Sequence, residues 1–99
     1  MKTDRFNLPE NAKKGIIDLA KKFDLNKVIL FGSRARGDNS PRSDIDIAIS
    51  GGNTTEFACS VDDCIDTLLM FDVVDLDGIV QKELLDVIES EGVLIYEKV

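Results

Sequence analysis

Two aspartates separated by a single residue, Asp44 and Asp46, have the spacing that most directly indicates chemistry in this sequence. In a β-strand their side chains would point to the same face, with Cα atoms about 6.6–7 Å apart. Because like charges at that separation repel each other, the pair needs a neighbouring cation. An all-oxygen site suits a hard cation such as Mg²⁺ or Mn²⁺. The alternative explanation of the same spacing is an edge strand whose polar face lies in solvent and binds nothing.

The segment before this pair is rich in groups that bind anions. Gly32 and Ser33 follow an apolar run, where a sharp turn can present N–H groups and a hydroxyl, and Gly37 permits a second close approach. Three arginines lie in the same segment: Arg34, Arg36 and Arg42. Guanidinium groups make forked contacts with phosphate oxygens, although loop arginines usually lie in solvent. A phosphate cradle beside a carboxylate pair, within fifteen residues from 32 to 46, indicates a site for a metal–nucleotide complex.

These groups must be held by strands and helices, whose order hydrophobic periodicity predicts. A capping-box pattern at Asn7 and Glu10, followed by apolar residues at helical spacing, predicts a first helix. Residues 28–31 are continuously apolar and predict a strand buried on both faces. Residues 44–49 alternate strictly, which places the isoleucines on one face and the two aspartates on the other. Between these strands, residues 32–43 predict a turn region with almost nothing that a core could use.

The second half of the chain predicts two helices and two strands. Residues 54–70 predict a long helix, residues 71–76 a strand, residues 79–91 a further helix stopped by Gly92, and residues 93–96 a last strand. The apolar stripes are Phe57, Val61, Cys64, Ile65, Leu68 and Leu69 on the first of these helices and Val80, Leu84, Val87 and Ile88 on the second. Because the first two strands are too close for a long crossover, we expect an α/β (α+β) fold with one small mixed β-sheet and flanking helices.

Length and charge limit the class of protein. The chain has 99 residues, of which 43% are hydrophobic, so we expect a single domain over residues 1–99. Its net charge of −7 is unevenly placed, since ten of twelve Lys and Arg precede residue 43 and fourteen of nineteen Asp and Glu follow residue 42. Direct binding to nucleic acid is disfavoured because no extended basic face follows residue 42. No run approaches the about 20 apolar residues that cross a bilayer, so we expect a cytoplasmic protein with no membrane partner.

The counts of histidine and cysteine exclude further classes. The sequence has no histidine, which excludes a His-based triad, a His-ligated zinc site and a histidine general base. Its two cysteines, Cys59 and Cys64, are too few for a zinc knuckle or a disulfide framework. We expect them to be small apolar residues in the core of a reduced protein.

The residues that carry the candidate chemistry also carry a family resemblance. Residues 32–37, Gly-Ser-Arg-Ala-Arg-Gly, and residues 43–46, Ser-Asp-Ile-Asp, resemble the signature Gly-Ser-x-Ala-Arg/Lys-Gly and Ser-Asp-x-Asp of the polymerase-beta-like nucleotidyltransferase superfamily. In length and layout the chain is similar to the minimal nucleotidyltransferases, the MNT or MntA-like antitoxins that are paired with HEPN-domain toxins. The resemblance extends from about residue 28 to residue 96. It implies the nucleotidyltransferase fold, a nucleoside triphosphate substrate and two divalent cations, Mg²⁺ or Mn²⁺.

The resemblance also implies roles for individual residues. The family chemistry uses a third carboxylate on a neighbouring strand, for which Asp72 and Asp75 are both candidates. The position in the motif favours Asp72, since Asp75 leads into the turn before the next helix. The catalytic and metal-binding set would then be Asp44, Asp46 and Asp72, and the nucleotide-binding set Gly32, Ser33, Arg36 and Gly37. Arg34 and Arg42 are weaker candidates for contact with the nucleotide or substrate.

The function implied by the resemblance is transfer of AMP from ATP to a hydroxyl of a HEPN-family toxin, which would silence that partner. The alternative is a binding module that neutralises its partner by stoichiometric contact. A third reading, modification of a small molecule, is disfavoured because the chain has no obvious second domain. The nucleotide base, the acceptor residue, and the choice between homodimer and hetero-oligomer stay open at this point.

Overall fold

The computed structural model describes residues 6–98, which form four helices and four strands. Their order is α1 (Glu10–Lys22), β1 (Lys27–Phe31), α2 (Ser33–Arg36), β2 (Ile45–Ser50), α3 (Thr54–Cys64), β3 (Phe71–Asp75), α4 (Lys82–Glu91) and β4 (Val93–Glu97). The strands make one sheet in the order β3-β2-β1-β4. Strand β1 is antiparallel to β2 and β4, whereas β2 and β3 are parallel. The predicted mixed sheet with flanking helices is confirmed.

The lengths of the connections explain these directions. Only α2 and a loop lie between β1 and β2, so β2 turns back beside β1. Helix α3 lies between β2 and β3 and is long enough to return the chain to the end of the sheet at which β2 begins. Strand β3 therefore pairs in parallel with β2.

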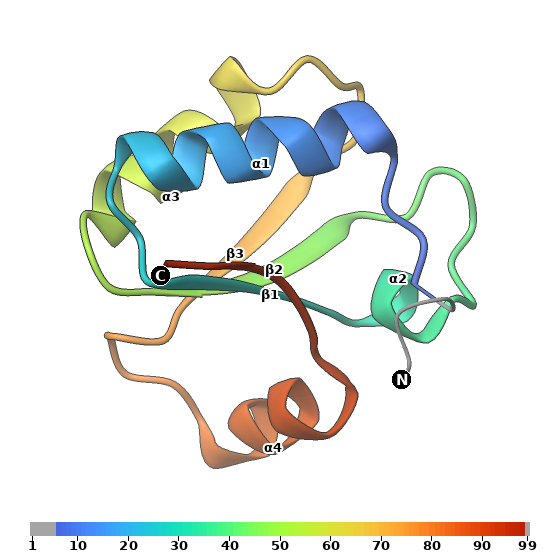
Figure 1. The fold of residues 1–99 in the computed structure, drawn as a ribbon. Helices are drawn as coiled ribbons and strands as arrows, with labels where there is room; N and C mark the ends of the chain where they lie inside the picture. The colour runs from blue at the N-terminus through green and yellow to red at the C-terminus, as the bar shows by residue number, and fades with distance from the viewer. Residues whose placement is uncertain (1–5, 99) are drawn as a thin grey trace.

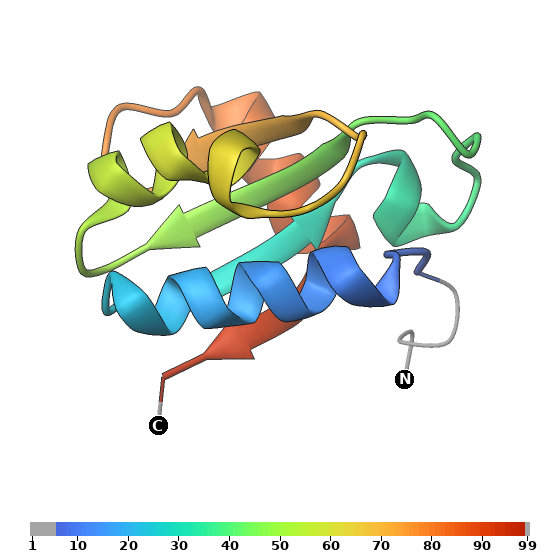
Figure 2. The ribbon, with the colours of Figure 1, turned by 90° about the horizontal axis from the view of Figure 1, so that it is seen from above.

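The helices cover the two faces of the sheet unequally (Figure 1). Helices α1 and α3 lie side by side on one face, as Figure 2 also shows, and α4 alone lies on the other. Strand residues buried in the larger cluster, under α1 and α3, are Val28, Leu30, Ile45, Ile47, Ile49 and Val93. The smaller cluster, under α4, consists of Phe31, Ala48 and Ile88. The alternation predicted for residues 44–49 is confirmed, because its isoleucines join the first cluster and Ala48 joins the second.

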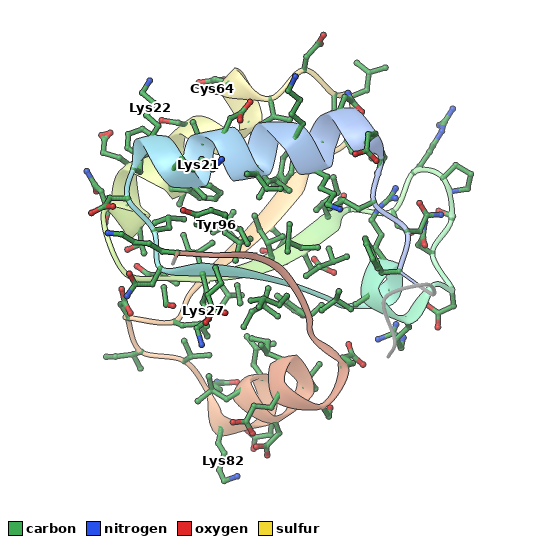
Figure 3. The ribbon with its side chains drawn as sticks, in the orientation of Figure 1. Lys21, Lys22, Lys27, Cys64, Lys82 and Tyr96 are labelled. Atoms are coloured by element: carbon green, nitrogen blue, oxygen red, sulfur yellow. The ribbon has the colours of Figure 1, made fainter. Side chains whose placement is uncertain are left out.

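The side chains follow the same division (Figure 3). Lys22 projects from α1 and Lys82 from α4, each away from the sheet. Tyr96 of β4 lies on the side of the sheet that faces α1 and packs against the larger cluster. Within residues 6–98, no helix is both long and apolar enough to cross a membrane.

The start of α1 differs from the prediction. Pro9 occupies the N-cap position and no side chain caps the helix, so the capping box at Asn7 and Glu10 is wrong. Asn7 instead uses its backbone, donating its N–H to the carbonyl of Arg34 at 2.8 Å and accepting from the Arg34 guanidinium at 3.2 Å. The residue is therefore taken by a contact with α2, which a local pattern does not reveal.

Helix α3 is shorter than the predicted helix over residues 54–70. It ends at Cys64, and Ile65 has an extended backbone that lets its side chain lie over Gly15 of α1. The chain must then return to Ile45, which pairs with Phe71. Of the predicted stripe, Phe57, Val61 and Ile65 are buried and Leu69 is half-buried, but Leu68 is fully exposed. Cys59 and Cys64 are also exposed, so their expected place in the core is wrong.

The last helix and its stop also differ in detail. Helix α4 begins at Lys82 rather than residue 79, and of its predicted stripe only Ile88 is buried, whereas Val87 is exposed. Gly92 follows the helix with φ −67°, so it is not required for a left-handed turn. A Cβ at this position would collide with the Ile88 carbonyl and lie 2.6 Å from Cγ2 of Ile29. Gly92 therefore allows the end of α4 to approach β1.

Candidate active site

The parallel pairing of β2 with β3 brings the predicted carboxylates to one end of the sheet. Asp46 is the register partner of Asp72, and Asp44 lies two residues before Asp46, on the same side of the chain. All three belong to the sheet face covered by α4, because their neighbours Ile45, Phe71 and Val73 contribute to the opposite cluster. Asp44 and Asp72 are exposed, whereas Asp46 is half-buried.

Asp46 has the electrostatic environment that its spacing predicted. Its pKa is raised above the ordinary value, first by burial and then by the negative charges of Asp72 and Asp44. Arg36 lowers the pKa of Asp46, and Glu91 raises it further. The carboxylates therefore destabilise one another in the absence of a cation, and a bound cation would relieve that repulsion.

Asp75, the alternative third carboxylate, has a different position and different partners. It pairs with Ile49 at the far end of β3, away from Asp46. Its Oδ2 accepts from the hydroxyl of Thr54 at 2.7 Å, and its Oδ1 accepts from the backbone N–H of Asp77 at 2.9 Å. These bonds fix the start of α3 and the turn after β3, so the placement favours Asp72 in the carboxylate set.

Gly32 lies directly beside the carboxylates. It has φ +78°, a conformation that side chains rarely adopt, and a Cβ here would collide with Oδ2 of Asp46. Ser33 begins α2, and its carbonyl accepts from the N–H of Gly37 at 2.8 Å. Gly37 has φ +86° and ends α2, so its role in the structure is to close this turn. Gly32 is therefore the glycine that permits a close approach.

Arg34 is not available to bind phosphate, which corrects one reading of the arginine cluster. Its side chain is buried, with a relative exposure of 2%. The guanidinium donates to three carbonyl oxygens, those of Ser43 at 3.0 Å, Pro41 at 3.1 Å and Asn7 at 3.2 Å. Ala35 is also buried, so the segment 32–43 contributes to the interior, contrary to prediction. Arg34 therefore ties the N-terminal segment to the loop before β2.

Arg36 and Gly32 share a partner that the sequence did not reveal, Glu91 at the end of α4. Oε1 of Glu91 accepts from the N–H of Gly32 at 3.0 Å and from the guanidinium of Arg36 at 2.9 Å. A second bond joins Nε of Arg36 to Asp38 at 3.1 Å. Glu91 is separated from Gly32 by 59 positions in the chain, and no local motif marks it.

Arg42 lies near Asp44. It is exposed in the loop before β2 and, with Asp44, lines a hollow of about 500 Å³. The remaining lining residues of the hollow are Pro41, Leu68, Leu69 and Met70. Leu68 and Met70 are among the most exposed large apolar residues of the described chain. An apolar hollow thus adjoins the carboxylate set.

The donor set suits a divalent metal ion by its chemistry. Asp44, Asp46 and Asp72 provide only carboxylate oxygens, the ligands that Mg²⁺ and Mn²⁺ prefer. Among residues 6–98, no three acidic, histidine or cysteine side chains are yet gathered closely enough to hold a metal. Asp44, Asp46 and Asp72 are the residues that would hold such a cation.

The chain is similar to a known protein family and to a curated protein. The model of the family described as "Polymerase beta, Nucleotidyltransferase" matches residues 14–99, which include every predicted site residue. A Methanocaldococcus jannaschii protein provisionally named a protein adenylyltransferase is 46% identical over 59 residues. The matched region covers 60% of this chain and 56% of that protein. The chain thus spans about half the length of this curated relative.

Solved structures with the same fold include toxin–antitoxin assemblies. A crystal structure of a toxin–antitoxin with AMP-PNP covers 87% of this chain and 73% of its own, at 23% identity and a TM-score of 0.63, which shows the fold alone. A mutant of the toxin–antitoxin MntA–HpeT covers 93% and 75%, at 27% identity and a TM-score of 0.66. A Sulfolobus solfataricus protein provisionally named a nucleotidyltransferase covers 90% and 79%, at 29% identity and a TM-score of 0.57. The predicted fold class is confirmed.

Proposed function

Because the chain belongs to the polymerase beta nucleotidyltransferase family, we propose that it transfers AMP from ATP to a hydroxyl of a partner toxin protein of the HEPN class. The observation that carries the proposal is the placement of three carboxylates on one sheet face, at the end of the sheet that also holds Gly32 and Arg36. The protein acceptor is supported by the relative named an adenylyltransferase and by the toxin–antitoxin structures.

The reaction is an in-line displacement at the α-phosphorus of ATP. A bond forms from the acceptor oxygen to phosphorus, the bond from phosphorus to the bridging oxygen breaks, and pyrophosphate leaves with the electron pair of that bond. The acceptor proton passes to Asp72, an exposed carboxylate on β3, and from there to water. Positioning and charge neutralisation supply most of the rate enhancement.

Each proposed residue has a defined task. Asp44, Asp46 and Asp72 would hold two divalent cations, which when bound neutralise the triphosphate and polarise the acceptor oxygen. Gly32 and Ser33 would present the backbone to the outgoing phosphates, and Gly37 would shape the turn that holds them. Arg36 would balance the charge of the leaving pyrophosphate.

The direct test is transfer of labelled AMP from ATP to the co-expressed partner in the presence of Mg²⁺. The double variant Asp44→Asn with Asp46→Asn should lower the rate by about a hundredfold or more, because it removes the charges that hold the cations. The matched control is Asp18→Asn with Asp63→Asn, two exposed carboxylates on α1 and α3. Unchanged transfer by the first double variant would show that the assigned site is wrong.

The second candidate function is neutralisation of the partner by contact alone. It is favoured by two exposed apolar side chains that line the hollow beside Asp44, Leu68 and Met70. A binder would still suppress toxicity in cells when both Asp44 and Asp46 are replaced by asparagine. Loss of protection in that variant, with the complex still forming, favours the enzyme.

A further inference from the structure

The seat proposed for the outgoing phosphates already contains an anionic group of the protein itself. The N–H of Gly32 and the guanidinium of Arg36 are two donors that the proposed function assigns to phosphate. Both donate to the same oxygen, Oε1 of Glu91, at 3.0 and 2.9 Å. A carboxylate oxygen that accepts from a backbone N–H and a guanidinium uses the same donors that would bind a phosphate oxygen.

We infer that Glu91 is an internal competitor for the pyrophosphate end of the nucleotide, displaced when the triphosphate enters and returning as pyrophosphate leaves. The inference rests on the proposed function, and it adds a residue that determines affinity and specificity for the phosphate chain. Only a ligand whose anionic oxygens replace Glu91 on both donors gains the full interaction. A nucleoside or a monophosphate would leave Glu91 in place.

The surroundings of Glu91 allow this exchange through a side-chain rotation. The backbone at the end of α4 is fixed, because Gly92 lies against Ile29 of β1 and its N–H donates to the Ile88 carbonyl at 2.9 Å. The Glu91 side chain itself is 23% exposed, so its carboxylate can turn into solvent. Arg36 also bonds to Asp38, and this bond keeps the guanidinium near Gly32 after the Glu91 carboxylate has turned away.

The Glu91–Arg36 contact is weak enough to be exchanged. The Arg36 side chain is 47% exposed, and exposed ion pairs are screened by water and salt. A pyrophosphate group carries more negative charge and more acceptor oxygens than one carboxylate, so it competes favourably for the same donors. Removing the charge of Glu91 while keeping its acceptor oxygen should therefore tighten the binding of phosphate chains.

The test is equilibrium titration of the purified full chain with pyrophosphate and, separately, with AMP, both in the presence of Mg²⁺. In the variant Glu91→Gln we expect about three- to tenfold tighter binding of pyrophosphate, since a neutral acceptor makes a weaker hydrogen bond to these donors. Binding of AMP should stay unchanged. Glu89→Gln is the matched control, because Glu89 is exposed on the same helix. Thermal unfolding verifies that each variant is folded.

The outcomes separate this inference from the proposed function. Tighter pyrophosphate binding by Glu91→Gln alone, with a lower KM for ATP in the transfer assay, supports the exchange. Equal or weaker pyrophosphate binding by that variant overturns the exchange and leaves the nucleotide site standing. If neither pyrophosphate nor ATP binds wild-type protein or either variant, both the inference and the proposed function are wrong.

Discussion

The two faces of the sheet have different constructions and different tasks. The face under α1 and α3 is closed by a continuous buried cluster, with Ile16, Phe57 and Ile47 fully buried. Within residues 6–98, the cluster under α4 has three buried residues, and four partly buried side chains pack against it: Ile29, Val74, Leu76 and Leu84. The candidate catalytic carboxylates all lie at one end of this thinner face. The fold therefore draws its stability mainly from one face and keeps the other accessible for chemistry.

Two hollows emphasise how open the α4 face is. One of about 500 Å³ lies between β3 and α4 and includes Val74 and Ile79, and Ile79 is fully exposed. The other, of about 440 Å³, lies beside β1 and β4 and includes Ile29 and Leu94. A single helix does not fill the space over four strands, so α4 leaves apolar surface on both sides.

The largest effect we expect is on the closed face. Phe57→Ala should lower the free energy of unfolding by about 3–5 kcal/mol, because it opens a cavity among fully buried side chains. Ile88→Ala, on the face under α4, should cost about 2 kcal/mol, since the smaller cluster can relax toward the adjoining hollow. Urea denaturation of both variants measures the difference. Equal losses in the free energy of unfolding of the two variants would contradict the inference that one face stabilises the fold while the other stays accessible.

A smaller but substantial loss of stability is expected at Arg34, in the segment between β1 and β2. Arg34→Met should lower the free energy of unfolding by about 2–4 kcal/mol, because three carbonyl oxygens lose their donor. Arg42→Met, an exposed arginine of the same loop, should stay within about 0.5 kcal/mol of wild type. Denaturation again provides the measurement. A phosphate-binding role for Arg34 would instead appear as weaker ATP binding with unchanged stability.

The smallest expected effect on stability is an increase, and it concerns Asp46 of the candidate site. Asp46→Asn should raise Tm by a few degrees while abolishing transfer, because it removes a half-buried carboxylate that Asp72 and Asp44 repel. The folded-state pKa of Asp46 is above its ordinary value, so the penalty is fully present above that raised pKa. It is lost as the pH falls through the raised pKa toward the ordinary value of an aspartate. The difference in Tm between variant and wild type, measured without metal, should therefore shrink as the pH is lowered. A Tm difference that grows on acidification would contradict the assigned repulsion.

The sequence was most informative where one residue type repeats with the period of its element. The alternation at 44–49 fixed which side chains enter the core, because a strand has a period of two. The prediction from periodicity was wrong where apolar residues keep the same spacing beyond the end of the element. Leu68 has helical spacing relative to Phe57 and Val61, yet the chain leaves the helix after Cys64 so that Ile65 can pack on α1. Helical spacing alone does not mark where tertiary contacts end a helix.

Parts of the site depend on pairings between distant segments. The motif around residues 32–46 marked Gly32, Asp44 and Asp46, but the opposition of Asp46 to Asp72 depends on the parallel register of two strands. The family resemblance favoured Arg36 over Arg34, but only the fold shows that Arg34 is buried and Arg36 exposed. Glu91 resembles the other acids of a solvated helix until α4 docks beside β1 and brings it to Gly32. Such contacts are set by topology, which local patterns do not encode.

The position of β4 beside β1 has a consequence for the order in which a nascent chain acquires its parts. By the time β3 has left the ribosome, α1, β1, β2 and α3 are all available, and they supply most of the larger cluster, to which β4 later adds Val93. The free edge of β1 stays uncovered until β4 emerges, and α4 precedes β4 directly. The contact from Glu91 to Gly32 and Arg36 can form only after α4 has been synthesised, long after its two donors. During synthesis, Gly32 and Arg36 are therefore available to an anion before the carboxylate of Glu91 exists.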